Sequence, residues 1–97
     1  MPLETTPFDP AAYLTSPEAT QEYLRAAFES GEAAAIADAL GVVARARGMS
    51  ALEAETGISR PGLYKALAKD GNPSLATILK VARALGYRLT AEPLPVR

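Results

Sequence analysis

Apolar residues recur at helical spacing along most of the chain, and glycines divide them into segments. Residues 17–30 follow Ser16, begin with Pro17 and end before Gly31, and residues 32–47 end before Gly48. Each segment therefore predicts a helix. Each helix would have one buried face. In the first helix that face carries Ala19, Tyr23, Leu24, Ala27 and Phe28, and in the second it carries Ile36, Leu40, Val43 and Ala44. Gly41 lies inside the second helix at a cost of about 1 kcal/mol relative to alanine, so we expect a neighbouring backbone to approach there.

Residues 50–69 predict two short helices separated by a glycine turn. Ser50 and Ser59 are good N-cap residues, and Gly57 stands where the chain must reverse. The apolar positions that would lock the two helices together are Leu52, Ile58, Leu63 and Leu67. The outward positions of the second helix are Arg60, Tyr64, Lys65 and Lys69. A helix-turn-helix with a basic outer face has the geometry that enters a DNA major groove.

The C-terminal third predicts one more helix and then an extended segment. The Asp-Gly-Asn-Pro run at 70–73 is a turn signal, and Ser74 caps a helix that ends near Leu85. Its expected inward residues are Leu75, Ile78, Leu79, Ala82 and Leu85. Apolar and polar residues alternate over 87–92, and this period of two predicts a short β-strand. The predicted fold class is therefore all-α with a short C-terminal strand.

Composition narrows the classes of function. The chain has 97 residues, 48% of them hydrophobic, which fits one globular domain. It contains no cysteine and no histidine, so disulfides, thiolate metal sites and the commonest general base are excluded. We find no Gly-rich phosphate loop and no carboxylate pair in an apolar pocket, and we therefore expect no enzyme, no cofactor and no metal. The sequence shows no signal peptide and no membrane span, which predicts a cytoplasmic protein without a membrane partner.

Charge is divided unevenly along the chain, although the net value is −1. Residues 1–44 carry seven acidic residues and one arginine, which gives −6. Residues 45–97 carry nine Lys or Arg and four acidic residues, which gives +5. Such asymmetry indicates two surfaces with different partners, or else chance clustering on solvated helix faces.

Three runs of the sequence resemble a known family over nearly the whole chain. They are ALGVVARARGMSALEAETGIS, LYKALAKDGNPSLATILKVARALGYRL and the lead-in AAYLTSPEATQEYLRAAF. The helix order is similar to the five-helix DNA-binding domain of the phage lambda repressor and Cro proteins, with an extra N-terminal helix or arm. The chain more closely resembles the probable addiction module antidotes, the HigA-type antitoxins. That resemblance implies a homodimer that binds palindromic operator DNA, represses its own transcription and neutralises a RelE/ParE-like toxin.

The resemblance divides the chain into three regions. Residues 1–31 form an N-terminal arm and helices, with a short helix at 10–14, and would bind toxin or form a dimer. Residues 32–86 form the helix-turn-helix domain, and 87–97 form the strand and tail. Two alternatives stay open: a protein-interaction module that caps a partner without binding DNA, and a stand-alone phage-type repressor.

Within this scheme the expected base-contacting residues are Arg60, Tyr64 and Lys65. Arginine at the first turn of the second helix can pair with guanine O6 and N7, and Tyr64 can contact a thymine methyl or shield the core edge. The expected phosphate contacts are Ser50, Ser59, Lys69 and Asn72, and the serines and Asn72 also fit capping and turn roles. The expected dimer residues are Tyr87, Leu89 and Ala91. Two alternatives stay open: the last helix forms the dimer, or the tail packs against the last helix of its own chain.

Two positions depart from the family pattern. Glu53 stands where relatives usually carry alanine, facing the second helix. It must point outward or open the helix pair, and Gly62 on the facing helix would make room. Pro61 stands where this fold often has a polar base reader, and proline has no N–H to donate.

Overall fold

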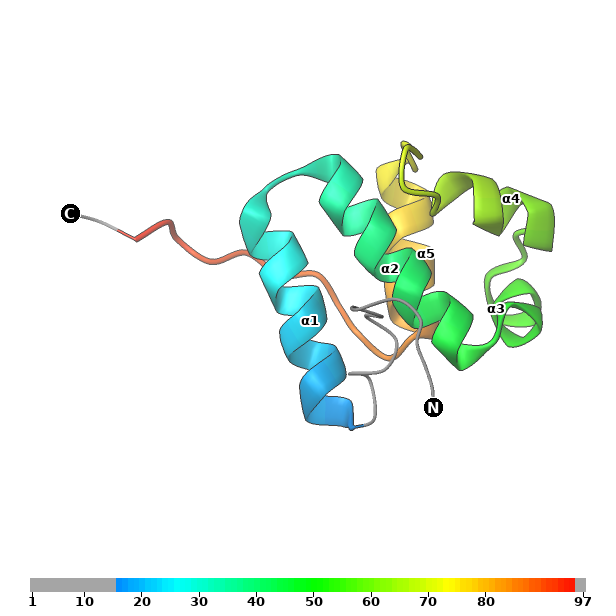
Figure 1. Ribbon diagram of the computed structural model, residues 1–97, viewed down its shortest axis with the longest axis horizontal. Helices are drawn as coiled ribbons and strands as arrows, with labels where there is room; N and C mark the ends of the chain where they lie inside the picture. Colours follow the sequence, from blue (N-terminus) through cyan, green and yellow to red (C-terminus); the bar gives the residue numbers. More distant parts are fainter. Residues whose placement is uncertain (1–15, 96–97) are drawn as a thin grey trace, which may run out of the picture.

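A computed structural model describes residues 16–95 and shows five α-helices (Figure 1). They are α1 (Pro17–Ser30), α2 (Ala33–Arg47), α3 (Met49–Thr56), α4 (Arg60–Ala66) and α5 (Leu75–Ala84). The described residues contain no β-strand. The all-α class is therefore confirmed, whereas the predicted C-terminal strand is wrong. The short helix expected at 10–14 lies outside the described residues.

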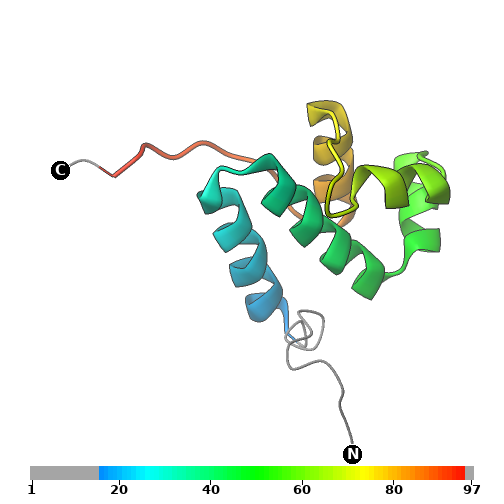
Figure 2. The ribbon, with the colours of Figure 1, turned by 45° about the horizontal axis from the view of Figure 1, so that its top comes forward.

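The long helices α1 and α2 lie side by side, and α3 and α4 stand at the far end of α2 from α1 (Figures 1 and 2). One cluster of buried residues joins all five helices. Its members are mainly aliphatic and include Leu24, Leu40, Val43, Leu52, Leu63, Leu67, Val81 and Leu85. Since Leu52 of α3 and Leu63 of α4 are fully buried in this cluster, the core holds the helix-turn-helix on the rest of the molecule.

Serine caps begin three of the helices. Ser16, Ser59 and Ser74 each accept a hydrogen bond from the N–H three residues on, at 3.1, 3.2 and 3.1 Å. Ser50 does not cap a helix, because α3 begins at Met49 and Gly48 occupies the N-cap position. The helix therefore starts two residues earlier than predicted, and Ser50 is an exposed residue of its first turn.

Gly41 makes the close approach that its sequence position predicts. A Cβ at Gly41 would collide with the carbonyl oxygen of Leu67 and would lie 3.3 Å from the Leu67 Cβ. Leu67 is the C-cap of α4, which ends at Ala66 rather than near Lys69 as expected. The end of α4 thus lies directly against α2.

The segment after α5 is extended but unpaired. Its first residue, Tyr87, donates its N–H to the Ala82 carbonyl at 2.8 Å and packs against the core. Leu89 is half-buried and Ala91 is exposed. An alternating pattern describes an extended chain, but a strand also needs a neighbour to pair with, and residues 16–95 supply none.

Two leucines of α5 are exposed, contrary to the expectation that both point inward. Leu75 is 67% exposed and Leu79 is 46% exposed. The buried residues Val81, Ala82 and Leu85 belong to the C-terminal half of α5 and its cap, whereas the two leucines belong to the first half of the helix. None of the helices described is long and apolar enough to cross a membrane.

Candidate nucleic-acid interface

The turn between α3 and α4 is held by a short set of local hydrogen bonds. Gly57 adopts φ 76° and donates its N–H to the Glu53 carbonyl at 2.9 Å. Thr56 Oγ1 donates to the Leu52 carbonyl at 2.7 Å and accepts from the Ile58 N–H at 3.1 Å. Because the left-handed φ suits glycine and the flanking N–H groups are satisfied, the reversal is tightly defined.

The first turn of α4 has its own donors satisfied. Ser59 Oγ accepts from the Gly62 N–H at 3.2 Å, and the Ser59 carbonyl accepts from the Leu63 N–H at 2.8 Å. Glu53 Oε2 accepts from the Arg60 N–H at 3.2 Å. Since Pro61 has no N–H, every backbone donor from residue 60 to residue 63 has a partner.

The Glu53 side chain is half-buried, and it reaches across the turn to cap the first residue of α4. Gly62 does not accommodate it: the atoms nearest to a Cβ at Gly62 are Ser59 Oγ at 3.1 Å and Ile58 Cγ2 at 3.3 Å. The absence of a side chain at Gly62 instead leaves space for the Ser59 cap. Sequence reasoning missed this role of Glu53, although a carboxylate seven residues before the head of the next helix was visible in the chain.

The outer face of α4 carries the three expected base readers. Arg60, Tyr64 and Lys65 are all exposed, and Tyr64 has 44% of its surface open to solvent. Arg60 and Tyr64 lie one helical turn apart, so they share one face. The structure therefore brings the predicted readers together on one short helix.

The expected phosphate-contacting residues surround that face but not as one cluster. Lys69 and Asn72 lie in the turn after α4 and are exposed, whereas Ser50 lies on α3. Ser59 is exposed, and its Oγ already serves as an acceptor for the Gly62 N–H. The serine hydroxyl proton is therefore the group that Ser59 has left to offer a phosphate.

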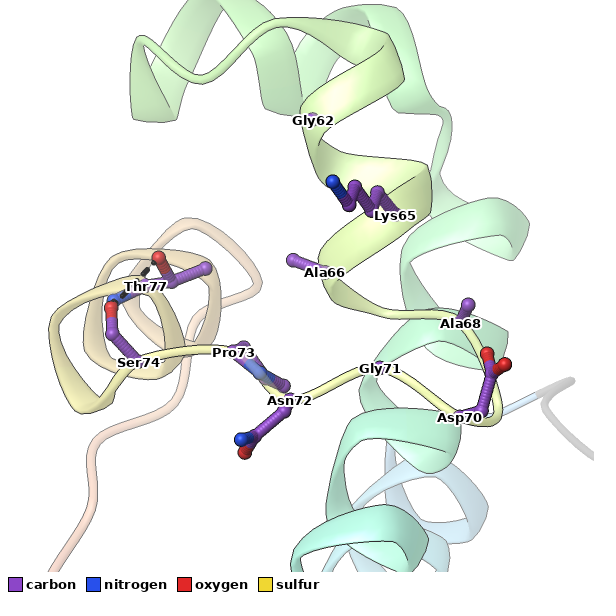
Figure 3. A pocket seen from close by; sticks show the side chains of 10 residues that line it. All are labelled: Gly62, Lys65, Ala66, Ala68, Asp70, Gly71, Asn72, Pro73, Ser74 and Thr77. Atoms are coloured by element: carbon purple, nitrogen blue, oxygen red, sulfur yellow. Dashed lines mark hydrogen bonds between the residues drawn. The ribbon is translucent and has the colours of Figure 1, made fainter.

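A groove of about 610 Å³ runs between the C-terminal half of α4 and the start of α5. Lys65 extends from α4 into the space between the helices, and Asn72 extends from the turn that leads to α5 (Figure 3). Ser74 and Thr77 line the opposite side, where the Ser74 hydroxyl donates to Thr77 Oγ1 at 3.1 Å. Asp70 also lines the groove, so its charge is mixed.

The electrostatics of the two ends of the molecule differ. On α1, Arg25 pairs with Glu22 at 2.8 Å and with Glu29 at 2.6 Å. The Arg25 guanidinium, through its hydrogen bond and its charge, holds the pKa of Glu22 below its usual range. Among residues 16–95 these are the ion pairs, so the cations of α4 face solvent without a carboxylate partner.

Comparison with known proteins identifies the family of the chain. The family described as "Probable addiction module antidote protein" matches residues 4–93. The chain belongs to this family. The chain is also 46% identical over 85 residues to an "Uncharacterized protein" of Haemophilus influenzae, and the match covers 88% of each chain. No solved structure is significantly similar to the chain.

Membership confirms the antidote resemblance that the sequence runs indicated. An addiction-module antidote implies a toxin as its partner in general, and such antidotes are generally not enzymes.

Proposed function

We propose that the protein is the antitoxin of a type II toxin–antitoxin module, which neutralises a RelE/ParE-like toxin and binds operator DNA as an autorepressor. The observation that carries the DNA role is the outer face of α4. It presents Arg60, Tyr64 and Lys65 to solvent from a helix whose opposite side, at Leu63, is fully buried. A rigidly supported helix with exposed cations on its outer side matches the recognition helix of a lambda-type helix-turn-helix.

Base reading would begin at Arg60, in the first turn of α4. An arginine fork pairs with guanine O6 and N7, and the N-terminal residues of a recognition helix are those that contact base edges. Tyr64 would lie one turn deeper, with its ring available to a thymine methyl group. Lys65 lies beside Tyr64 and at the edge of the groove, from which it would contact a base or a phosphate.

Phosphate contacts would come from residues on both sides of α4. Lys69 and Asn72 follow the helix and Ser50 precedes it, whereas Ser59 is engaged as the N-cap of α4 beside the Glu53 carboxylate. Contacts of this kind fix the orientation of the protein without reading sequence. They also make affinity fall as salt rises, because each neutralised phosphate releases counterions.

Toxin neutralisation would use the acidic half of the chain. Glu18, Glu22, Glu29 and Glu32 are exposed on α1 and in the loop that follows it. The Arg25 ion pairs offset part of this charge, but the net charge of residues 1–44 is −6. A basic toxin would be attracted to this surface and away from the cationic surface of α4.

A homodimer would allow two copies of α4 to read a palindromic operator. The structure describes a single chain and therefore does not test the dimer role of Tyr87, Leu89 and Ala91, which stays a prediction. The exposed Leu75 and Leu79 of α5 offer a second apolar surface for the partner copy. Leucines four residues apart lie on one helical face, so both would contact the same partner.

Two assays test the proposal. In a gel shift the protein should retard its own promoter in preference to a scrambled duplex, and co-expression should rescue growth against the small basic protein encoded beside it. If the protein rescues growth but binds neither the promoter nor the scrambled duplex, the result favours a protein-interaction module without a DNA role. DNA binding without a neighbouring toxin gene would favour a stand-alone repressor.

A further inference from the structure

We infer that Glu53 is a positioning residue for DNA reading, which both fixes the head of α4 and keeps phosphates away from it. This inference rests on the proposed DNA role of α4. Glu53 belongs to α3, yet its Oε2 accepts the Arg60 N–H at 3.2 Å, across the turn. Arg60 is the leading base reader, so Glu53 holds the backbone of the residue that would start sequence recognition.

Glu53 also joins the two helices through its main chain. Its carbonyl accepts the Gly57 N–H at 2.9 Å, which closes the end of α3. The same residue thus terminates one helix and caps the next, with Gly57 between them. A tilt of α4 against α3 would stretch the side-chain bond to Arg60, so Glu53 adds to the core contacts that hold the angle between the two helices.

The charge of Glu53 has a second consequence. The head of a helix normally attracts phosphate, because its first N–H groups are unpaired and its dipole is positive there. In α4 those N–H groups are bonded to Glu53 and Ser59, and a half-buried carboxylate stands among them. A DNA phosphate that approaches this point meets a like charge.

Repulsion of this kind acts most on non-specific binding. Non-specific complexes depend on phosphate contacts, whereas the specific complex also gains base contacts. A carboxylate next to Arg60 therefore penalises complexes in which Arg60 lies against the backbone. Glu53 raises the ratio of operator affinity to non-specific affinity, although it lowers total affinity.

The test compares Glu53→Gln with Glu53→Ala and a matched control, Glu55→Gln. Glutamine keeps an oxygen that can accept the Arg60 N–H and removes the charge, whereas alanine removes both. Glu55 lies on the same helix but lines a different groove, with Lys80 and Arg83 of α5. The control thus changes the net charge equally at a site away from the head of α4.

Fluorescence anisotropy is measured with the protein's own promoter and with a scrambled duplex. For Glu53→Gln we expect scrambled-DNA affinity to rise about threefold and operator affinity to rise less, so the ratio falls. For Glu55→Gln the ratio should match wild type. If the two glutamine variants change the ratio equally, the charge of Glu53 has no local role and the inference is overturned.

An NMR readout tests the positioning separately from DNA binding. The Arg60 amide proton of Glu53→Ala should shift upfield and exchange faster with solvent than in wild type, and Glu53→Gln should lie between them. An unchanged Arg60 amide in Glu53→Ala would overturn the positioning role. If wild type does not bind its promoter more tightly than the scrambled duplex, the proposed function and the charge effect are both wrong. The Arg60 amide signal still tests whether Glu53 caps α4.

Discussion

Gly41 of α2 lies against the carbonyl oxygen of Leu67, so closely that a Cβ at Gly41 would collide with it. This contact joins the longest helix to the end of α4, the helix that carries Arg60 and Lys65. The position of α4 therefore depends on a missing side chain on its neighbour. A backbone atom cannot move aside as a flexible side chain can, and so the site tolerates little change.

Gly41→Ala should destabilise the protein by about 1–3 kcal/mol, because added atoms in a packed site force backbone shifts. The gain of about 1 kcal/mol in helix propensity offsets part of that cost. Thermal unfolding followed by circular dichroism measures the difference. Gly62→Ala is the comparison: its nearest atoms are side-chain atoms of Ser59 and Ile58, which can shift, so its cost should be smaller. Equal melting of Gly41→Ala and wild type would contradict the close packing.

Arg47 ties α2 to the end of α5. Its Nη2 donates to the Leu85 carbonyl at 3.0 Å, and Leu85 is the C-cap of α5. A cation at a helix C-terminus also interacts favourably with the helix dipole. Arg47→Ala should therefore lower the free energy of unfolding by about 1 kcal/mol in urea denaturation. Arg45→Ala, on the same turn of α2, removes a cation without such a bond and should cost less.

Exposed leucines on α5 predict a dimer surface that can be removed without unfolding the monomer. Leu75→Ser with Leu79→Ser changes side chains that are 67% and 46% exposed, so helix content should be preserved. Light scattering should report a dimer for wild type and a monomer for the double variant. Leu94→Ser is the matched control, because Leu94 is 86% exposed on the C-terminal segment. A double variant that stays dimeric would exclude α5 and favour the segment with Tyr87, Leu89 and Ala91.

Tyr23 predicts a loss of stability in alkali. Burial raises the pKa of its phenol, the charge of Asp38 raises it further, and Arg45 partly opposes the shift. A raised pKa means that the folded state favours the neutral phenol. The stability that the neutral phenol contributes is fully present below the unfolded pKa of about 10. This stability is lost as the pH rises through the pKa of Tyr23 in the folded state. Above pH 10 the free energy of unfolding, measured in urea, should therefore fall more steeply with pH for wild type than for Tyr23→Phe. Equal pH slopes for the two proteins would contradict the burial argument.

Much of the fold follows from local signals in the sequence. Ser16, Ser59 and Ser74 are followed by helical patterns and do cap helices, because a serine cap acts within three residues. Gly31, Gly48 and Gly57 end helices where expected. The close backbone approach at Gly41 could also be predicted, because a glycine inside a helix costs stability unless a neighbour packs against it.

Features that depend on distant partners were not predictable in the same way. The alternation at 87–92 describes an extended chain, but the sequence does not say whether another strand lies beside it. Leu75 and Leu79 fit a buried stripe by spacing, yet α5 is covered on one side and leaves both exposed. The bond from Arg60 to Glu53 depends on how two helices meet, which residue spacing alone does not give.

The central claim is that Arg60 on α4 reads operator sequence. Fluorescence anisotropy with the protein's own promoter and a scrambled duplex, between 50 and 200 mM salt, tests it most directly. Arg60→Ala should lose about 1–3 kcal/mol of operator affinity and little affinity for the scrambled duplex, with Arg83→Ala on α5 as the control for charge. Wild-type affinity should fall steeply as salt rises. Equal losses on both duplexes, or binding that does not respond to salt, would contradict the account.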